Sequence, residues 1–371
     1  MVGAGLTWLI SLVGGGGPPS ARAVAAGGIV GLLCCVFCYV PLELVSGRLQ
    51  PTPYLARQIA RAAVLVLGGV TGWMVANWVT QAALGVAFST SSRSLVVIVS
   101  LTVGAIFITY DQLTSRLRAS IEQLKRREVE RAELELAGDI QRRLLPPTLV
   151  TGDGYRVIAR HRPARVVAGD FYDVFRLGDG SLAVVVADVV GKGMGASLIM
   201  ATVKAMIPLL AADRSITDTT RELNRRLHRE LGRREFVALA FIRLDPRTGR
   251  VELVNAGLPD PYLRQPDGAV STVAACGPRL PVGVRAEVEY EATAIELRPG
   301  QRLVILTDGI PETRTAGGDL LGYDGLTRLL ARPGEETETW LDELLGQVEA
   351  RTSGDADDDW TVVVVEVREG R

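Results

Sequence analysis

The chain has 371 residues, enough for two or three domains, and its 42 acidic and 41 basic residues leave a net charge of −1. This balance lacks the basic excess of nucleic-acid-binding proteins, so no nucleic-acid partner is expected. Hydrophobic residues make up 47% of the chain, and they are unevenly distributed. Few charges occur in the first 110 residues, and most of the charged residues follow them.

Three apolar runs lie in this first part of the chain. Residues 23–42 contain no charged side chain, residues 62–88 form a longer uncharged run, and residues 95–110 form a shorter one. About twenty apolar residues are needed to cross the hydrocarbon core of a bilayer. We therefore expect residues 1–110 to be a membrane region with about three transmembrane helices.

The basic residues between these runs predict the orientation of the membrane region. Arg48, Arg57 and Arg61 lie in the first loop, whereas the second loop has only Arg93. Several more lysines and arginines follow the third run. Because short cytoplasmic loops are enriched in Lys and Arg, the first loop and everything after residue 110 are expected in the cytoplasm.

Residues 111–145 predict one long polar helix, because the only Gly or Pro among them is Gly138. The helix carries a narrow apolar stripe that changes phase after a gap of five residues. The stripe consists of Leu117, Ile121, Leu124, Val129, Ala132, Leu136, Ile140 and Leu144. Such a stripe is typical of a two-stranded coiled coil, so a parallel homodimer through residues 111–145 is expected. The alternative is a single solvated helix with pairs such as Glu122 and Arg126. "LLPP" ends the helix, which gives a linker of residues 111–147.

The remaining residues, 148–371, contain short apolar runs joined by turn signals such as "GDGS" and "DPRTG". This pattern predicts antiparallel strands with grouped helices, an α+β domain. Strands are expected at residues 155–161, 171–177, 182–187, 237–244, 251–255, 288–297, 303–306 and 361–367, and helices at 195–212, 217–231, 324–330 and 337–350. The two histidines, His161 and His228, lie among arginines and are expected at the surface.

Aspartates abut four of these predicted strands. The motifs are "VVAGD" with Asp170, "VVVADVVGKG" with Asp188, "LVILTDG" with Asp308, and "DADDDWTVVVVEV" with Asp358 and Asp359. Each aspartate alone is explained by a helix cap or a turn. Clustered carboxylates repel one another and are costly to bury, and oxygen-binding divalent cations such as Mg²⁺ or Mn²⁺ remove that cost. The "GKG" after Asp188 lacks the first glycine and the Ser or Thr of a nucleotide-binding loop.

The motifs "ELAGDIQRRLLPP", "PARVVAGDFYDVF", "ADVVGKGMGAS", "LVNAG", "LTDGIPE" and "DDDWTVVVVEV" occur in this order over roughly residues 133–369. Together they resemble the metal-dependent serine/threonine phosphatases of the bacterial sporulation and stress-response regulator type, within the protein phosphatase 2C (PP2C) superfamily. The resemblance implies a four-layer α-β-β-α sandwich over residues 148–371, with two Mn²⁺ or Mg²⁺ ions between the sheets. The membrane region carries no such signature; its apolar runs predict a multi-pass protein, and with the bacterial family resemblance the expected location is the bacterial cytoplasmic membrane.

Carried over onto this sequence, the resemblance implies a set of catalytic metal ligands. Asp170 and Asp188 hold the ions together with the backbone carbonyl of Val189; Asp308 holds one ion, and Asp358 or its neighbour Asp359 holds the other. Arg165 is a candidate for gripping the substrate phosphate. Two such ions activate a water for attack on phosphorus, so no nucleophilic side chain is required.

Two positions depart from the family pattern, since Lys192 and Leu258 replace the histidines of "DVSGHG" and "NAGHPP". Neither is among the expected ligands, so an active enzyme is still predicted. The resemblance implies hydrolysis of phosphoserine or phosphothreonine on an anti-sigma-factor antagonist. The alternative is a weakly active sensor or scaffold that docks the same partner.

Overall fold

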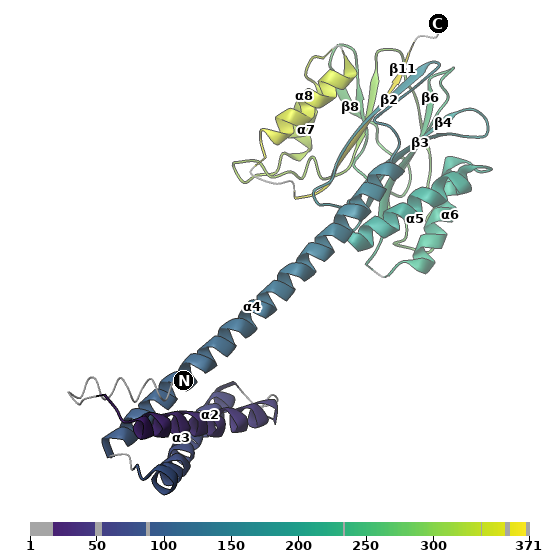
Figure 1. Ribbon diagram of the computed structural model, residues 1–371. Coiled ribbons are helices and arrows are strands. Elements are labelled where there is room, and N and C mark those ends of the chain that lie inside the picture. Colours follow the sequence, from purple (N-terminus) through teal and green to yellow (C-terminus); the bar gives the residue numbers. More distant parts are fainter. Residues whose placement is uncertain are drawn as a thin grey trace. The chain divides into compact units, whose positions relative to one another are not determined.

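The computed structural model describes residues 18–48, 54–86, 90–232, 234–334, 336–352 and 357–368 (Figure 1). The chain divides into two compact units, one ending at Arg126 and one beginning at Arg127. This boundary falls inside the predicted linker, so the three-part division at residues 110 and 147 remains a prediction.

The first unit contains α2 (Ala21–Arg48), α3 (Tyr54–Leu84) and the first part of α4 (Thr90–Leu144). α2 and α3 pack closely because α3 has glycines at the contact. A Cβ on Gly68 would lie 2.3 Å from the Phe37 carbonyl oxygen, and one on Gly72 would lie 2.9 Å from the Cys34 Cα. Small residues that let helix backbones approach are typical of helix pairs in membranes.

Three described helices are long and apolar enough to cross a membrane: Ala21–Val45, Ile59–Leu84 and α5 (Met194–Ala211). The first two match the first two predicted spans. In α5, however, Met200, Val203 and Ile207 are buried in the core of the second unit. Packing against the sheet therefore also explains why α5 is apolar. The third predicted span, residues 95–110, is helical within α4, but many of its side chains lie outside the described residues.

The second unit contains two antiparallel sheets (Figure 1). The six-stranded sheet has the order β1 (Leu149–Gly152), β2 (Tyr155–Arg162), β11 (Trp360–Val367), β10 (Arg302–Leu306), β7 (Tyr262–Arg264) and β8 (Val270–Thr272). The five-stranded sheet has the order β3 (Phe171–Arg176), β4 (Leu182–Val189), β5 (Val237–Leu244), β6 (Arg250–Ala256) and β9 (Thr293–Glu296).

Helices cover the outer face of each sheet, as Figure 1 shows for the teal and yellow pairs. α5 and α6 (Ile216–Glu230) pack on the five-stranded sheet, whereas α7 (Gly322–Leu330) and α8 (Thr337–Glu349) pack on the six-stranded sheet. A third core fills the space between the two sheets. The predicted four-layer α-β-β-α sandwich is therefore confirmed.

The continuous apolar runs arise because the central strands are buried on both faces. In β4 and β11, successive valines point alternately into the core between the sheets and into a helix-covered core. Burying a valine side chain contributes about 1.5–3 kcal/mol, so these strands anchor the domain. Asp188 near the end of β4 and Asp359 just before β11 are therefore attached to well-packed strands.

The expected strand at residues 288–297 is wrong in extent, because only Thr293–Glu296 is β9. Before it, the chain leaves the sheet and packs against α6: Tyr290 is completely buried, its hydroxyl donates to the Leu280 carbonyl at 2.9 Å, and its own carbonyl accepts from Arg221. Three short strands, β1, β7 and β8, were not predicted. They have only three or four residues each, too few to show an alternating pattern.

Candidate metal centre

Asp170 and Asp188 lie at the same end of two paired strands. Asp170 directly precedes β3, and Asp188 is next to last in β4, where Phe171 pairs with Ala187. The Asp170 side chain is 2% exposed. One of its oxygens, Oδ2, accepts hydrogen bonds from the hydroxyls of Thr307 and Thr361, each at 2.7 Å. These hydroxyls come from the opposite sheet, so Asp170 is fixed between the two layers.

The electrostatics show that the predicted carboxylates influence one another. Burial, and then the Asp188 carboxylate, raise the pKa of Asp170 well above its usual value. Burial, and then Asp308, raise the pKa of Asp188 to about 6, and Asp358 and Asp359 act in the same direction. For Asp308, burial, Glu312 and Asp358 raise the pKa. Segments from four parts of the sequence therefore bring their negative charges to one region.

This cluster fits a divalent cation by its donor chemistry. Carboxylate oxygens are the ligands that Mg²⁺ and Mn²⁺ prefer, and a cation offsets both the cost of burying these charges and their mutual repulsion. Within the described residues, no three His, Cys, Asp or Glu side chains converge closely enough to hold one ion as they stand. Lys192 supplies a positive charge at the edge of the cluster, with its Nζ 3.0 Å from Oδ2 of Asp358.

Asp358 and Asp359 have different surroundings. Oδ1 of Asp359 accepts from the Ala164 N–H at 2.7 Å, and its Oδ2 accepts from the Gly169 N–H at 2.8 Å. Asp359 thus anchors the backbone that leads to Asp170. The Asp358 side chain is 47% exposed and pairs with Lys192. Its electrostatic effect reaches both Asp188 and Asp308.

Two glycines allow the segments that carry the carboxylates to pack backbone against backbone. A Cβ on Gly169 would lie 2.8 Å from the carbonyl oxygen of Val189. A Cβ on Gly309 would lie 2.1 Å from the carbonyl oxygen of Asp359. The predicted ligand carbonyl of Val189 is therefore next to the residue that precedes Asp170, and Asp308 and Asp359 belong to adjoining turns.

The end of the linker helix also reaches this site, which the sequence did not reveal. The buried Gln141 side chain of α4 donates from Nε2 to the Ala168 carbonyl at 2.7 Å, and its Oε1 accepts from the Ala168 N–H at 2.9 Å. Gly138 makes this approach possible, because a Cβ there would lie 2.4 Å from the Val166 carbonyl oxygen. Gln141 and Asp359 thus hold the same loop before Asp170 from two sides.

His161 corrects the expectation that both histidines lie at the surface. It is half-buried on β2, and its Nδ1 lies 3.0 Å from Oγ1 of Thr361, one of the two hydroxyls on Asp170. His228 is exposed as expected, with Nδ1 2.9 Å from the Gly283 carbonyl oxygen. No local motif marks His161, because its partner lies 200 residues away.

The remaining predicted positions lie around the cluster. Arg165 is exposed on the loop anchored by Asp359. Leu258, at one of the two departures from the family pattern, is buried, and its backbone N–H donates to the Asn255 side chain at 3.0 Å. A buried leucine has no group for proton transfer, so any such role of the family histidine is absent at this position.

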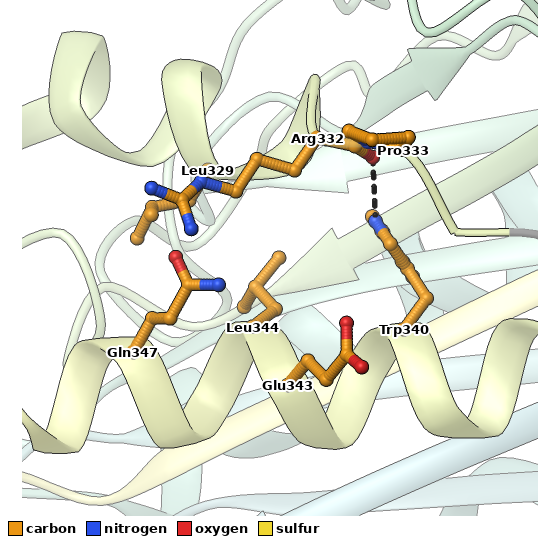
Figure 2. A pocket seen from close by; sticks show the side chains of 7 residues that line it. All are labelled: Leu329, Arg332, Pro333, Trp340, Glu343, Leu344 and Gln347. Atoms are coloured by element: carbon orange, nitrogen blue, oxygen red, sulfur yellow. Dashed lines mark hydrogen bonds between the residues drawn. The ribbon is translucent and has the colours of Figure 1, made fainter.

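A separate hollow lies between α7 and α8 (Figure 2). It is lined by Leu329, Arg332, Pro333, Trp340, Glu343, Leu344 and Gln347. The Trp340 indole N–H donates to the Arg332 carbonyl at 3.2 Å across one end of it. None of the predicted site residues lines this hollow, so it is distinct from the carboxylate cluster.

Comparison with known proteins identifies the family. Residues 178–368, just over half of the chain, match the family model of stage II sporulation protein E (SpoIIE). The chain belongs to this family, whose members carry a PP2C-type phosphatase domain. The matched residues include Asp188, Asp308 and Asp358, whereas Arg165 and Asp170 precede them.

Several curated proteins are similar in sequence. Protein IcfG of Synechocystis is 25% identical over 295 residues, which cover 71% of this chain and 46% of that protein. Phosphoserine phosphatase RsbU of Bacillus subtilis is 27% identical over 192 residues, covering 51% of this chain and 56% of the relative. The chain thus spans about half the length of the curated relatives it matches.

Solved structures show the same fold. The PP2C domain of SiaA from Pseudomonas aeruginosa matches with a TM-score of 0.56 at 19% identity, covering 65% of this chain and 98% of that one. The structure of the PP2C domain and a regulatory fragment of SpoIIE from B. subtilis matches with a TM-score of 0.51 at 22% identity, covering 58% and 63%. The predicted resemblance to the sporulation and stress-response phosphatases is confirmed.

Proposed function

We propose that this chain is a metal-dependent protein phosphatase that hydrolyses phosphoserine or phosphothreonine. The observation that carries this proposal is the buried pair Asp170 and Asp188, whose pKa values are raised by burial and by neighbouring carboxylates. Buried groups with perturbed pKa values concentrate at functional sites. Membership of the SpoIIE family supports phosphate-ester hydrolysis as the reaction at this carboxylate cluster.

The metal ligands we propose are Asp170, Asp188, the Val189 carbonyl, Asp308 and Asp358. Two bound Mn²⁺ or Mg²⁺ ions supply an activated water and neutralise the phosphate oxygens. The hydroxyls of Thr307 and Thr361 hold Oδ2 of Asp170, and we assign its other oxygen, Oδ1, to an ion.

Asp359, the alternative to Asp358, is better explained as an anchor. Both of its oxygens already accept from backbone N–H groups, and a hydrogen-bonded carboxylate of this kind fixes a loop. Asp358 remains available to an ion once Lys192 moves away. The exposed Arg165 lies on the anchored loop, and we assign it to binding the substrate phosphate.

The substrate we propose is a phosphorylated protein, specifically an anti-sigma-factor antagonist in a partner-switching pathway. RsbU and RsbP of B. subtilis, both similar to this chain, are named phosphoserine phosphatases.

We further propose that the phosphatase is anchored in the bacterial cytoplasmic membrane by several spans, with its catalytic domain in the cytoplasm. α2 and α3 support the anchoring, and the basic residues of the first loop support the orientation. The apolar stripe of α4 is exposed along its length, from Leu117 at 53% to Ile140 at 52%. Pairing of residues 111–145 with a second copy would bury this stripe.

The test uses the full-length protein, purified in detergent, and a phosphoserine peptide. We expect phosphate release that requires Mn²⁺ or Mg²⁺ and is abolished by Asp188→Asn. Asp213→Asn, which changes an exposed aspartate after α5, is the matched control and should behave as wild type. Wild-type protein that binds a phosphorylated partner but releases no phosphate at saturating Mn²⁺ would favour the alternative, a weakly active scaffold.

A further inference from the structure

A chain of hydrogen bonds runs from β2 to the metal centre. His161 and Thr361 are directly paired in the ladder between β2 and β11. Oγ1 of Thr361 lies 3.0 Å from Nδ1 of His161 and 2.7 Å from Oδ2 of Asp170. The backbone N–H of Thr361 also donates to the Thr307 hydroxyl, the second donor to Asp170.

The number of protons sets the direction of these bonds. A threonine hydroxyl has one hydrogen, and that of Thr361 is used on the Asp170 carboxylate. Its oxygen must then accept from His161, so Nδ1 of the imidazole carries the hydrogen. Burial lowers the pKa of His161, which agrees with a neutral ring that has a single N–H.

The same network leaves one oxygen of Asp170 for another partner. In the described part of the chain, the hydrogen bonds recorded to Oδ2 of Asp170 come from neutral hydroxyls, not from a lysine or an arginine. Hydroxyl donors orient a carboxylate without neutralising its charge. The Asp188 carboxylate is close enough to raise the pKa of Asp170, after the larger effect of burial.

We propose that His161 is a positioning residue of the metal centre: through Thr361 it fixes the orientation of Asp170, so that one carboxylate oxygen is held and the other faces the ion. This inference rests on the proposed function, because it takes Asp170 as a metal ligand. Hydrogen-bond partners of metal ligands typically contribute about 10–100-fold to metal affinity.

The test compares variants of the full-length protein in detergent. Mn²⁺ affinity is measured by calorimetry, and thermal unfolding is measured in EDTA. Because His161 acts on Asp170 through Thr361, His161→Ala should weaken Mn²⁺ binding by up to about 10-fold, the lower end of the range for direct partners. His161→Asn should restore most of the affinity, because its amide N–H occupies nearly the place of the Nδ1–H. His228→Ala is the matched control, since His228 is exposed and contacts only a loop carbonyl among its recorded bonds.

A purely structural role of His161 predicts a different pattern. His161→Ala would then lower the unfolding temperature in EDTA and leave the Mn²⁺ affinity of the folded protein at the wild-type value, which overturns the proposal. If His161→Ala does not fold, His161→Asn is compared with His161→Gln, which places its amide one bond further out. Equal Mn²⁺ affinities of these two variants would also overturn it.

The Mn²⁺ affinity of Asp188→Asn tests the proposed function separately from the role of His161. Loss of Mn²⁺ binding in Asp188→Asn, with unchanged binding in both His161 variants, refutes the role of His161 and leaves the phosphatase standing. Unchanged Mn²⁺ binding in Asp188→Asn refutes the metal centre itself.

Discussion

The side of the sandwich under α7 and α8 and the end that carries Asp170 and Asp188 treat buried charge in opposite ways. Near α7 and α8, Arg302 pairs with Glu366 at 3.1 Å and stacks over Trp340 at 5.0 Å, and the buried Arg264 donates to the carbonyls of Leu330 and Arg332. Beside β3 and β4, Asp170 and Asp188 instead face each other and further carboxylates. The arginines of the first side have acceptors within the protein, whereas the carboxylates of the second side repel one another and fit a cation.

This difference teaches where to look for function in a domain with many charged residues. In the ion pair of Arg302 with Glu366, opposite charges meet inside the protein. Carboxylates that repel one another destabilise the metal-free protein. Such a cluster therefore indicates a functional site, where a bound ion balances the negative charge. Substitutions on the two sides should therefore separate stability from metal binding.

The largest effect on stability is expected at Arg302. Arg302→Ala removes one ion-pair partner of the half-buried Glu366 and the contact with Trp340, while Arg156 and the Thr337 hydroxyl stay beside Glu366. Breaking a fully buried ion pair costs about 3–5 kcal/mol; because Glu366 keeps two partners, the free energy of unfolding should fall by about 2–3 kcal/mol. Mn²⁺ affinity of the folded protein should not change. Urea unfolding and calorimetry measure the two quantities, and a parallel loss of Mn²⁺ affinity would contradict the separation of the two sides.

Asp188→Asn should have the opposite effect on the metal-free protein and stabilise it. The pKa of Asp188 in the folded state, about 6, lies above its unfolded value of 3.8. Stability from this carboxyl is therefore fully present below about pH 3.8 and is lost as pH rises through about 6. The asparagine avoids this loss, so in EDTA at pH 7.5 the variant should be more stable by on the order of 2 kcal/mol.

The pH dependence provides the internal control for this prediction. Between pH 7.5 and pH 5 the advantage of Asp188→Asn should shrink, because Asp188 of the wild type becomes protonated. The stabilisation of the wild type by Mn²⁺ should shrink over the same range, since the ion then competes with protons. Thermal unfolding at both pH values, with Mn²⁺ or EDTA, measures both trends. A constant difference across this range would show that the titration of Asp188 is not the cause.

Asp358 and Asp359 should differ in what their removal affects. Asp359→Ala leaves the N–H groups of Ala164 and Gly169 without their acceptors and should cost about 1–3 kcal/mol of stability. Asp358→Ala removes a half-exposed group and should leave the unfolding temperature in EDTA nearly unchanged while weakening Mn²⁺ binding. Thermal unfolding and metal titration of the two variants decide which residue is the ligand. The reverse pattern would assign the ligand to Asp359.

The smallest effect is expected at Lys192. Its ammonium group pairs with Asp358 at 3.0 Å, at a position 38% exposed to solvent. Exposed ion pairs contribute about 0–1 kcal/mol. Lys192→Ala should therefore change the free energy of unfolding by no more than about 1 kcal/mol and the Mn²⁺ affinity by no more than about fivefold. A loss of activity as large as that of Asp188→Asn would instead indicate that Lys192 binds the substrate phosphate.

Much of the domain was predictable from local sequence. Apolar runs such as those of β4 and β11 identify strands buried on both faces, and the aspartates that follow or precede them identify the acidic end of the sandwich. These features are local, because a strand that is buried on both faces consists of consecutive apolar residues. The ordered motifs from Asp170 to Asp358 were sufficient to predict the four-layer fold and the family.

The supporting residues were decided only by the tertiary structure. Asp359 reaches Ala164, Gln141 reaches Ala168, and His161 reaches Thr361, across 195, 27 and 200 residues of sequence. Nothing near His161 distinguishes it from a surface histidine, and nothing in the aspartate run separates Asp359 from Asp358. Such roles depend on which strands become neighbours in the sheet, and hydrogen bonds of about 3 Å exist only after that long-range pairing has formed.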